Sequence, residues 1–187
     1  SFTNSGAEAN EKALALCRLH AARPDANRIL AFQGSFHGRT LLALHATWNP
    51  KKRGPFEIPG YEVAFAPFPA RTDDRTLEPP APDGYLAAAA EGDIETLLAL
   101  PAAKTDALVA QEVEALQVVD EHLRSGDIFV CMIEPMQSEG GDRYATARFY
   151  QALRLLTRHH QVSMLMDEVQ TGYGLGGPFS WASSFGL

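Results

Sequence analysis

Apolar residues along the chain form short continuous runs, separated by longer stretches with a helical period. The runs are typical of buried strands and cover residues 28–33, 61–66, 127–133 and 162–166. Residues 127–133 (Asp-Ile-Phe-Val-Cys-Met-Ile) are almost wholly apolar, as expected for a central strand of a parallel sheet. The helical stretches are 5–22, 84–125 and 146–160, with one or two further turns over 40–46.

Each long helical stretch shows a start, a break or a buried face. The first begins with a capping box, because Ser5 is followed three residues later by Glu8. The second is expected to break at Pro101. The positions expected to face the core are Ala9, Ala13, Leu16, Cys17 and His20 in the first stretch, Val109, Val113 and Leu116 in the second, and Phe149, Ala152, Leu153 and Leu156 in the third.

This alternation of strands and helices predicts an α/β fold, a three-layer sandwich with a mainly parallel central sheet. Residues 47–60 and 67–83 are rich in proline and are expected to be irregular connections. In such sheets, ligands bind beyond the carboxyl ends of the strands. The loops that begin at Gly34, Glu134 and Asp167 are therefore expected to converge on one crevice.

The composition fits one globular domain or a large piece of one. The chain has 187 residues, 45% of them hydrophobic, and its 16 basic and 23 acidic side chains give a net charge of −7. This acid excess argues against a nucleic-acid partner. No apolar run approaches the roughly 20 residues of a membrane span, and the first residues do not resemble a signal peptide. Cys17 and Cys131 form no disulfide framework, so we expect reduced thiols and a cytoplasmic location.

The first candidate for chemistry is the start of the opening helix, Asn4-Ser5-Gly6-Ala7-Glu8. Free backbone N–H groups and the helix dipole make such a terminus a site for an anion. Gly6 would let the backbone approach a phosphate closely. The alternative is a plain capping box with no ligand.

The second candidate is the loop Phe36-His37-Gly38-Arg39. An aromatic side chain beside a glycine and an arginine suits a flat ring and a carboxylate, because arginine pairs with carboxylates in a two-pronged geometry. The alternative is an ordinary loop with a half-buried Phe36 and a solvated Arg39.

Carboxylates that follow two of the apolar runs are the remaining candidates. Glu134 and Glu139 lie in a loop with paired glycines, a location that favours a site but that many surface loops share. Asp167 ends the last apolar run and needs a partner, such as a protonated heterocyclic nitrogen or a metal ion. These three carboxylates lack any clear metal-loop spacing, so no metal is expected. The glycines of 172–177 do not follow the strand directly, which argues against a dinucleotide fingerprint.

Together, in this order and at these separations, the segments resemble the class III pyridoxal-phosphate-dependent aminotransferases of fold type I. The matching strings are TNSGAEANE (residues 3–11), FHGRT (36–40), IEPMQSEGGD (133–142) and MDEVQTGYG (166–174). Within the family, the third string and residues 66–69 are most similar to the 4-aminobutyrate branch. Lysine 6-aminotransferases, ornithine-type enzymes and aminomutases of the same family stay open.

The resemblance implies that pyridoxal 5'-phosphate is the cofactor and assigns residues to its phosphate and to its ring faces. Gly6 and Ala7 would hold the phosphate through backbone N–H groups, and Ser5 is assigned to cofactor binding as well. Phe36 would stack on one face of the pyridine ring, and Val169 would press on the other.

Further residues are assigned to the polar atoms of the ring. Asp167 would pair with the protonated pyridine nitrogen, so that the ring can act as an electron sink. Gln170 would contact the phenolic oxygen. His37 and Glu134 are placed around the cofactor as well, Glu134 as a supporting contact.

The substrates implied are a small-molecule amino donor and a 2-oxo acid acceptor. Arg39 would take a substrate carboxylate. Glu139 would lie near the amino-acid pocket and control which arginine there is free. The resemblance further implies a homodimer, located in the cytoplasm or, for a eukaryotic protein, in the mitochondrial matrix.

The chain lacks several features that the family pattern includes. The family's cofactor-binding lysine lies a few tens of residues beyond the segment of Asp167, and no lysine follows that residue here. We therefore expect residues 1–187 to be a partial cofactor-binding large domain, without the N-terminal segment or the C-terminal small domain, and to be inactive alone. Ser5 and Glu8 stand where animal enzymes carry cysteines, so no iron–sulfur cluster is expected. The alternative of another class is a non-catalytic fragment or pseudoenzyme.

Overall fold

A parallel four-stranded sheet forms the centre of the protein. The computed structural model describes residues 2–60, 62–71, 78–175, 177 and 179–187. The strand order is β2-β1-β3-β6, and every neighbouring pair is parallel. The strands are β1 Arg28–Phe32, β2 Val63–Ala66, β3 Ile128–Ile133 and β6 Ser163–Met166. All four apolar runs therefore became strands, although Tyr61 of the second run lies outside the described residues.

Helices surround this sheet, and a short hairpin follows β3. The helices are α1 Gly6–Leu19, α2 Leu41–His45, α3 Pro50–Arg53, α4 Tyr85–Glu91, α5 Ile94–Ala99, α6 Pro101–Thr105, α7 Ala107–Arg124, α8 Ala147–His159 and α9 Trp181–Ser184, with a 3-10 turn at Gly54–Phe56. The hairpin pairs β4 Met136–Gln137 with β5 Arg143–Tyr144. No described helix has the length and apolar character that crossing a membrane requires.

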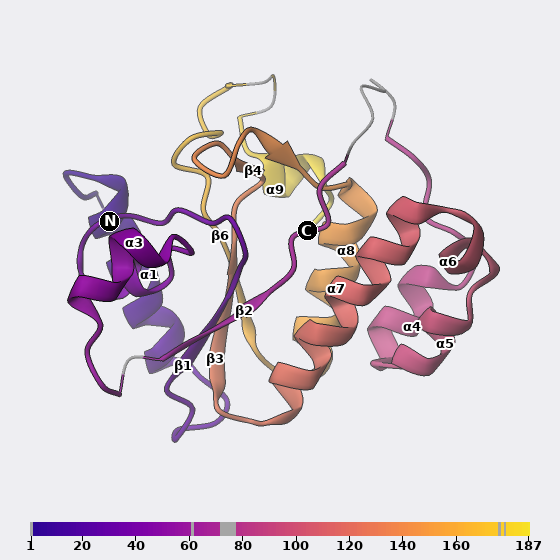
Figure 1. Ribbon diagram of the computed structural model, residues 1–187, viewed down its shortest axis with the longest axis horizontal. Coiled ribbons are helices and arrows are strands. Elements are labelled where there is room, and N and C mark those ends of the chain that lie inside the picture. The colour runs from indigo at the N-terminus through magenta and orange to yellow at the C-terminus, as the bar shows by residue number, and fades with distance from the viewer. Residues whose placement is uncertain (1, 61, 72–77, 176, 178) are drawn as a thin grey trace.

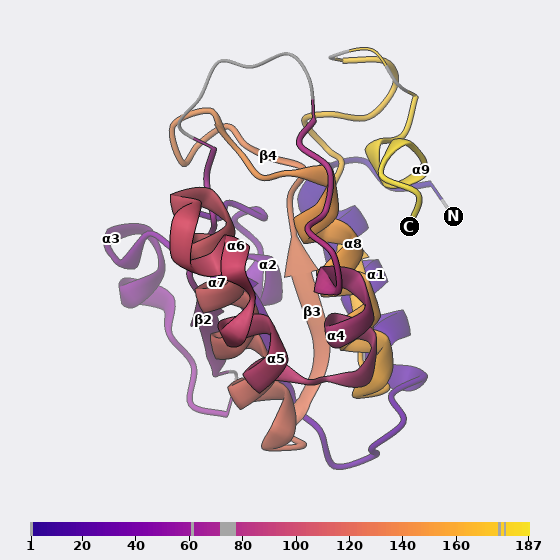
Figure 2. The same ribbon diagram turned by 90° about the vertical axis from the view of Figure 1, so that its right-hand side faces the viewer.

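The central strands β1 and β3 are buried on both faces, which explains why they are apolar. In β1, Leu30 and Phe32 join the core formed with α4, α5, α7 and α8. The alternate residues Ile29 and Ala31 pack in a second core that includes Leu14 of α1. Figure 1 shows α1 and α3 on one side of the strands and α4 to α8 on the other, and Figure 2 shows α4 to α7 in front of the sheet. The predicted three-layer α/β sandwich is confirmed.

Most expected helix faces are buried, but the face of α1 was wrongly predicted. The inward residues expected in α7 and α8 are all buried, and Pro101 starts a new helix. Leu16 of α1 and His20, the residue that caps its end, are exposed, whereas Asn10 and Leu14 are buried. Asn10 turns inward because its amide has buried hydrogen-bond partners, which an apolar pattern does not reveal.

Three stretches expected to be irregular contain short elements. The proline-rich residues 47–60 hold α3, where Asn49 caps the first turn and Pro50 occupies a position that needs no N–H donor. The loop after β3 folds into the β4–β5 hairpin. The last loop ends in α9, whose first backbone N–H groups donate to the carboxylate of Glu168.

A buried ion pair joins α7 to the start of α8. Arg148 Nε lies 2.8 Å from Glu112 Oε2, and the Thr146 hydroxyl donates to Glu112 Oε1 at 2.7 Å. Burial raises the pKa of Glu112, while the hydrogen bonds from Arg148 and Thr146 oppose that shift. The buried charge of Glu112 therefore needs the charge of Arg148 beside it to be stable.

Replacement of Arg148 by alanine leaves the carboxylate of Glu112 buried without its charged partner. We expect the free energy of unfolding to fall by about 3–5 kcal/mol. Arg158→Ala, at an exposed position of the same helix, is the matched control and should change it by less than about 0.5 kcal/mol. Urea unfolding followed by circular dichroism measures both, and equal losses in the two variants would contradict this role.

Candidate functional site

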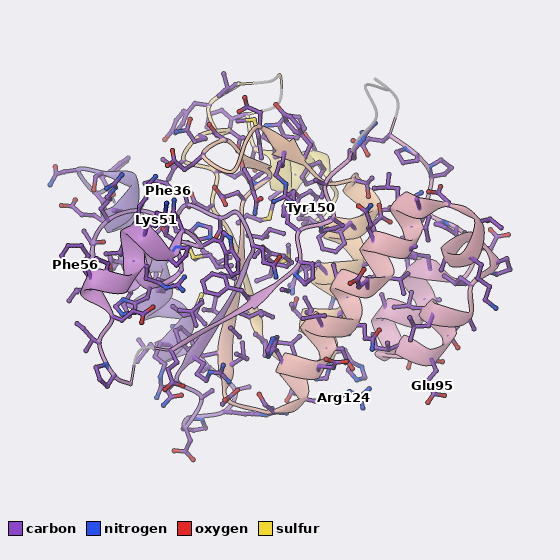
Figure 3. All side chains as sticks on the ribbon, in the orientation of Figure 1. Phe36, Lys51, Phe56, Glu95, Arg124 and Tyr150 are labelled. Atoms are coloured by element: carbon purple, nitrogen blue, oxygen red, sulfur yellow. The ribbon has the colours of Figure 1, made fainter. Side chains whose placement is uncertain are left out.

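A cavity of about 280 Å³ lies where the loops after β1, β3 and β6 meet the first turn of α1. This is the edge formed by the carboxyl ends of the strands, and Phe36 is labelled there in Figure 3, away from Arg124 at the other end. The predicted convergence of the three loops is confirmed. The lining residues are Gly6, Ala7, Asn10, Phe36, His37, Gly38, Arg39, Glu134, Asp167, Val169 and Gln170.

The first turn of α1 presents backbone donors to this cavity. Ser5 is the N-cap, and its hydroxyl accepts from the N–H of Glu8 at 3.2 Å. Glu8 in turn accepts from the N–H of Asn4 at 2.7 Å, the residue before the cap, whereas a standard capping box uses the N–H of the cap residue itself. The N–H groups of Gly6 and Ala7, at the first two helical positions, have no acceptor within the helix. Ser5 itself is not among the described residues that line the cavity.

Two glycines allow the loops to approach this turn closely. A Cβ on Gly6 would lie 2.6 Å from a methyl group of Val169. A Cβ on Gly38 would lie 2.6 Å from that of Ala7, and the backbone of Gly38 has a φ of +135°. Neither contact is possible for a larger residue without movement of the backbone or of a neighbouring side chain.

Asp167 is the most connected polar group of the site. Its N–H donates to the carbonyl of Ile133 at 2.8 Å, which fixes it at the end of β6. Its Oδ2 atom accepts from Asn10 Nδ2 at 2.8 Å and lies 2.8 Å from His37 Nδ1. Its Oδ1 atom accepts from the N–H of Val169 at 3.2 Å. The carboxylate is therefore held by two segments that are distant in sequence, α1 and the loop after β1, and by its own loop.

Asn10 is the site residue that the sequence reasoning missed. Its side chain is buried and donates both to Asp167 and to the carbonyl of His37, each at 2.8 Å. The sequence could have indicated it, because Asn10 lies one helical turn after Gly6 and a helical turn brings both residues to the same face. The start of that helix was already a candidate site.

Glu134 is a second buried carboxyl group on the same wall. Burial, together with the negative charge of Asp167, raises its pKa to about 9, although a 3.3 Å hydrogen bond from the N–H of Phe36 favours the charged form. At neutral pH Glu134 is therefore protonated. The hydroxyl of Tyr150 lies 3.0 Å from the carbonyl oxygen of Glu134 and fixes the end of β3.

Two cationic side chains lie near the ring of Phe36 at the rim of the site. The guanidinium of Arg39, an exposed residue, lies 5.9 Å from the centre of the Phe36 ring, and Lys52 Nζ lies 5.5 Å from the same centre. Glu139 forms an ion pair with Lys52 and lines a neighbouring hollow of about 400 Å³ rather than the cavity itself. Val169 and Gln170 are exposed at the mouth.

Other kinds of site find less support in the geometry. Within the described part of the chain, no three His, Cys, Asp or Glu side chains are grouped so that they could hold a metal ion. A larger hollow of about 570 Å³ lies beside β2, but His45 there accepts from the N–H of Ile58 and Arg53 is paired with Glu57. Gly176 and Pro178, which bear on the dinucleotide alternative, lie outside the described residues.

Gly38→Ala tests the contact between the loop after β1 and α1. The new methyl group meets Ala7, and a positive φ adds backbone strain of about 1–3 kcal/mol. Gly141→Ala is the matched control, because Gly141 has a φ of +104° but no atom within 4 Å of the place that a methyl group would take. We expect Gly38→Ala to lower the free energy of unfolding by at least about 1 kcal/mol more than the control. Equal losses in denaturant unfolding would show that the close contact is not needed.

The raised pKa of Glu134 makes stability depend on pH. Between its ordinary value of 4.5 and about 9, the folded protein keeps a proton that the unfolded chain releases. The free energy of unfolding therefore falls as pH rises through this window, by up to about 1.4 kcal/mol per pH unit. Glu134→Gln removes this contribution, so its stability relative to the wild type should increase from about pH 5 to about pH 9. Parallel stability curves for the two cofactor-free proteins would contradict the assignment.

Comparison with known proteins places these observations in a family. The family profile described as "Aminotransferase class-III" matches residues 1–186. A 4-aminobutyrate aminotransferase from Dictyostelium discoideum is 36% identical over 156 residues, which are 82% of this chain and 26% of that protein. A succinylornithine transaminase from Salmonella paratyphi B is 35% identical over 179 residues, 94% of this chain and 33% of that protein. The chain thus spans about a quarter to a third of the length of these curated relatives.

Solved structures agree with the sequence comparison. A lysine aminotransferase from M. tuberculosis superimposes with a TM-score of 0.73 at 26% identity, over 100% of this chain and 39% of that one. An amine transaminase from an uncultivated Pseudomonas species, solved in its PLP-bound form, shares the fold with a TM-score of 0.71 at 18% identity, over 99% of this chain and 37% of that one. The chain belongs to the class-III aminotransferase family, whose members depend on pyridoxal 5'-phosphate.

Proposed function

We propose that the cavity binds pyridoxal 5'-phosphate and that the complete protein transfers an amino group from an ω-amino acid resembling 4-aminobutyrate to a 2-oxo acid. The observation that carries this proposal is the shared cavity of Asp167 and the first turn of α1. An acidic group and a set of free backbone donors at one small cavity suit a ligand that has a cation at one end and a phosphate at the other.

The spacing of the two ends fits such a ligand. Asn10 contacts Asp167 and lies four residues beyond Gly6 in α1. Four residues correspond to a rise of about 6 Å along the helix. The phosphate would therefore accept hydrogen bonds from the N–H groups of Gly6 and Ala7, and the positive end of the helix dipole would favour its charge.

The walls of the cavity suit an aromatic ring. Phe36 would cover one face and Val169 the other. Asp167 would accept a hydrogen bond from the ring nitrogen and hold its proton there, while Gln170 would reach the phenolic oxygen. Because Glu134 is protonated at neutral pH, Asp167 is the carboxylate that balances the ring cation.

When bound, the cofactor would supply an aldehyde for the donor's amino group and a ring that can serve as an electron sink. The residues of this chain bind, orient and hold protons. Arg39 would bind a substrate carboxylate, and Glu139, paired with Lys52, would set the charge on the neighbouring side of the mouth. The lysines of the chain are Lys12, Lys51, Lys52 and Lys104, and none follows Asp167. We therefore expect the 187 residues alone not to turn over.

The relatives differ in the amino donor for which they are named. Relatives of about equal identity are named for 4-aminobutyrate and for succinylornithine, and a structural neighbour is named for lysine. Lysine 6- or ornithine-type transfer and an aminomutase reaction are the alternatives within the family. A non-catalytic role is the alternative of another class. The homodimer, the cytoplasmic or mitochondrial location and the absence of a nucleic-acid partner stay predictions.

The test uses the complete gene product with its cofactor. Each of 4-aminobutyrate, lysine and ornithine is mixed with it, and the absorbance change of the cofactor and the formation of glutamate from 2-oxoglutarate are followed. We expect 4-aminobutyrate to give both signals. Asp167→Asn should lower kcat/KM by about 10- to 100-fold, the loss of a charge-assisted hydrogen bond of roughly 1.5–3 kcal/mol.

Each of the alternative results leads to a different conclusion. Glutamate formed only from lysine or ornithine rejects the 4-aminobutyrate assignment but keeps the reaction. Isomerisation of an amino acid without a 2-oxo acid indicates an aminomutase. Failure of the complete protein to bind pyridoxal 5'-phosphate would overturn the proposed function and favour a non-catalytic role.

A further inference from the structure

We propose that Asn10 and His37 are positioning residues, which aim the carboxylate of Asp167 at the cofactor and fix its distance from the phosphate-binding turn. The inference rests on the proposed function. It goes further by assigning a role to Asn10 and by giving His37 a definite function.

Asn10 connects three parts of the site through one nitrogen atom. Its Nδ2 atom has two hydrogens and two acceptors, Asp167 Oδ2 and the carbonyl of His37, each at 2.8 Å. The side chain is buried, so water does not replace these bonds. Because Asn10 belongs to the same rigid helix as Gly6 and Ala7, it holds the carboxylate at a fixed place relative to those N–H groups.

Only an uncharged double donor suits this position. Both atoms opposite Asn10 are acceptors, and a carboxylate accepts only. An aspartate here would place a second negative charge against Asp167 and remove both hydrogen bonds. A leucine would leave Asp167 and the carbonyl of His37 without these partners.

His37 holds the same oxygen as Asn10 does. Its Nδ1 atom lies 2.8 Å from Asp167 Oδ2, and its side chain is fully buried. Since the carboxylate can only accept, Nδ1 carries the hydrogen in this contact. His37 Nε2 is buried without a hydrogen-bond partner.

Asn10 and His37 both contact Oδ2 of Asp167 and so fix the direction from which the ring nitrogen can approach the carboxylate. Val169 donates to Oδ1 from the loop that follows β6, so that the whole carboxylate is fixed in its plane. If Asn10 or His37 is lost, Asp167 can rotate or shift. The resulting loss should affect the interaction with the ring nitrogen and leave the phosphate-binding amides intact.

The experiment compares two ligands on the complete gene product. One is pyridoxal 5'-phosphate, and the other is its 1-deaza analogue, in which carbon replaces the ring nitrogen. The ratio of their dissociation constants isolates the contribution of that nitrogen. In the wild type we expect the natural cofactor to bind about 10- to 100-fold more tightly than the analogue.

Asn10→Leu should reduce this preference to about threefold or less, while affinity for inorganic phosphate stays unchanged. Asn27→Leu, an exposed asparagine before β1, is the matched control and should retain the full preference. Circular dichroism and the unfolding midpoint show whether each variant is folded.

His37 provides a second, independent pair of variants. In His37→Asn the side-chain amide can occupy the place of Nδ1–H, so the preference for the natural cofactor should be largely kept. In His37→Leu it should fall as in Asn10→Leu. This pair keeps the inference testable if Asn10→Leu does not fold.

The outcomes separate this inference from the proposed function. If the wild type binds neither ligand, the proposed function fails. If the wild type prefers the natural cofactor, and folded Asn10→Leu or His37→Leu keeps that preference, the positioning role is wrong and the proposed function stands. A rescue by His37→Asn but not by His37→Leu supports the role of the Nδ1 donor.

Discussion

The fixed position of one buried carboxylate is the constraint on which the rest of the site depends. Asp167 is almost fully buried, and an unpaired charge in such a place is unfavourable. The fold supplies three protein partners, from α1, from the loop after β1 and from the loop after β6. All of them can be satisfied only when these segments come together at the carboxyl ends of the strands. The same contacts that make the charge tolerable therefore also shape the cavity.

Close packing and charge balance complete the arrangement. Gly6 and Gly38 let Val169 and Ala7 approach to distances that any side chain would block. Glu134, only one loop away, is kept neutral by burial and by the charge of Asp167. The site thus has a single buried negative charge, free backbone donors and an aromatic wall. The proposed binding of a cofactor with a cationic ring and a phosphate rests on this combination.

The sequence was sufficient for features that follow from local periodicity and from sheet topology. Continuous apolar runs identified the strands, a 3.6-residue period identified the buried face of α8, and parallel strands implied that their following loops would meet. Features set by distant partners were not predictable in this way. The side chain of Asn10 is buried with hydrogen-bond partners that lie 27 and 157 residues away in the sequence. Glu139 pairs with Lys52 across 87 residues, which no spacing rule anticipates.

The most direct test of the account is a crystal structure of the complete protein with pyridoxal 5'-phosphate bound. We predict that the ring nitrogen lies about 2.7–3.0 Å from an oxygen of Asp167, and that phosphate oxygens lie about 3 Å from the N–H groups of Gly6 and Ala7. A ring nitrogen directed away from Asp167, or a phosphate bound in the hollow beside β2, would contradict it.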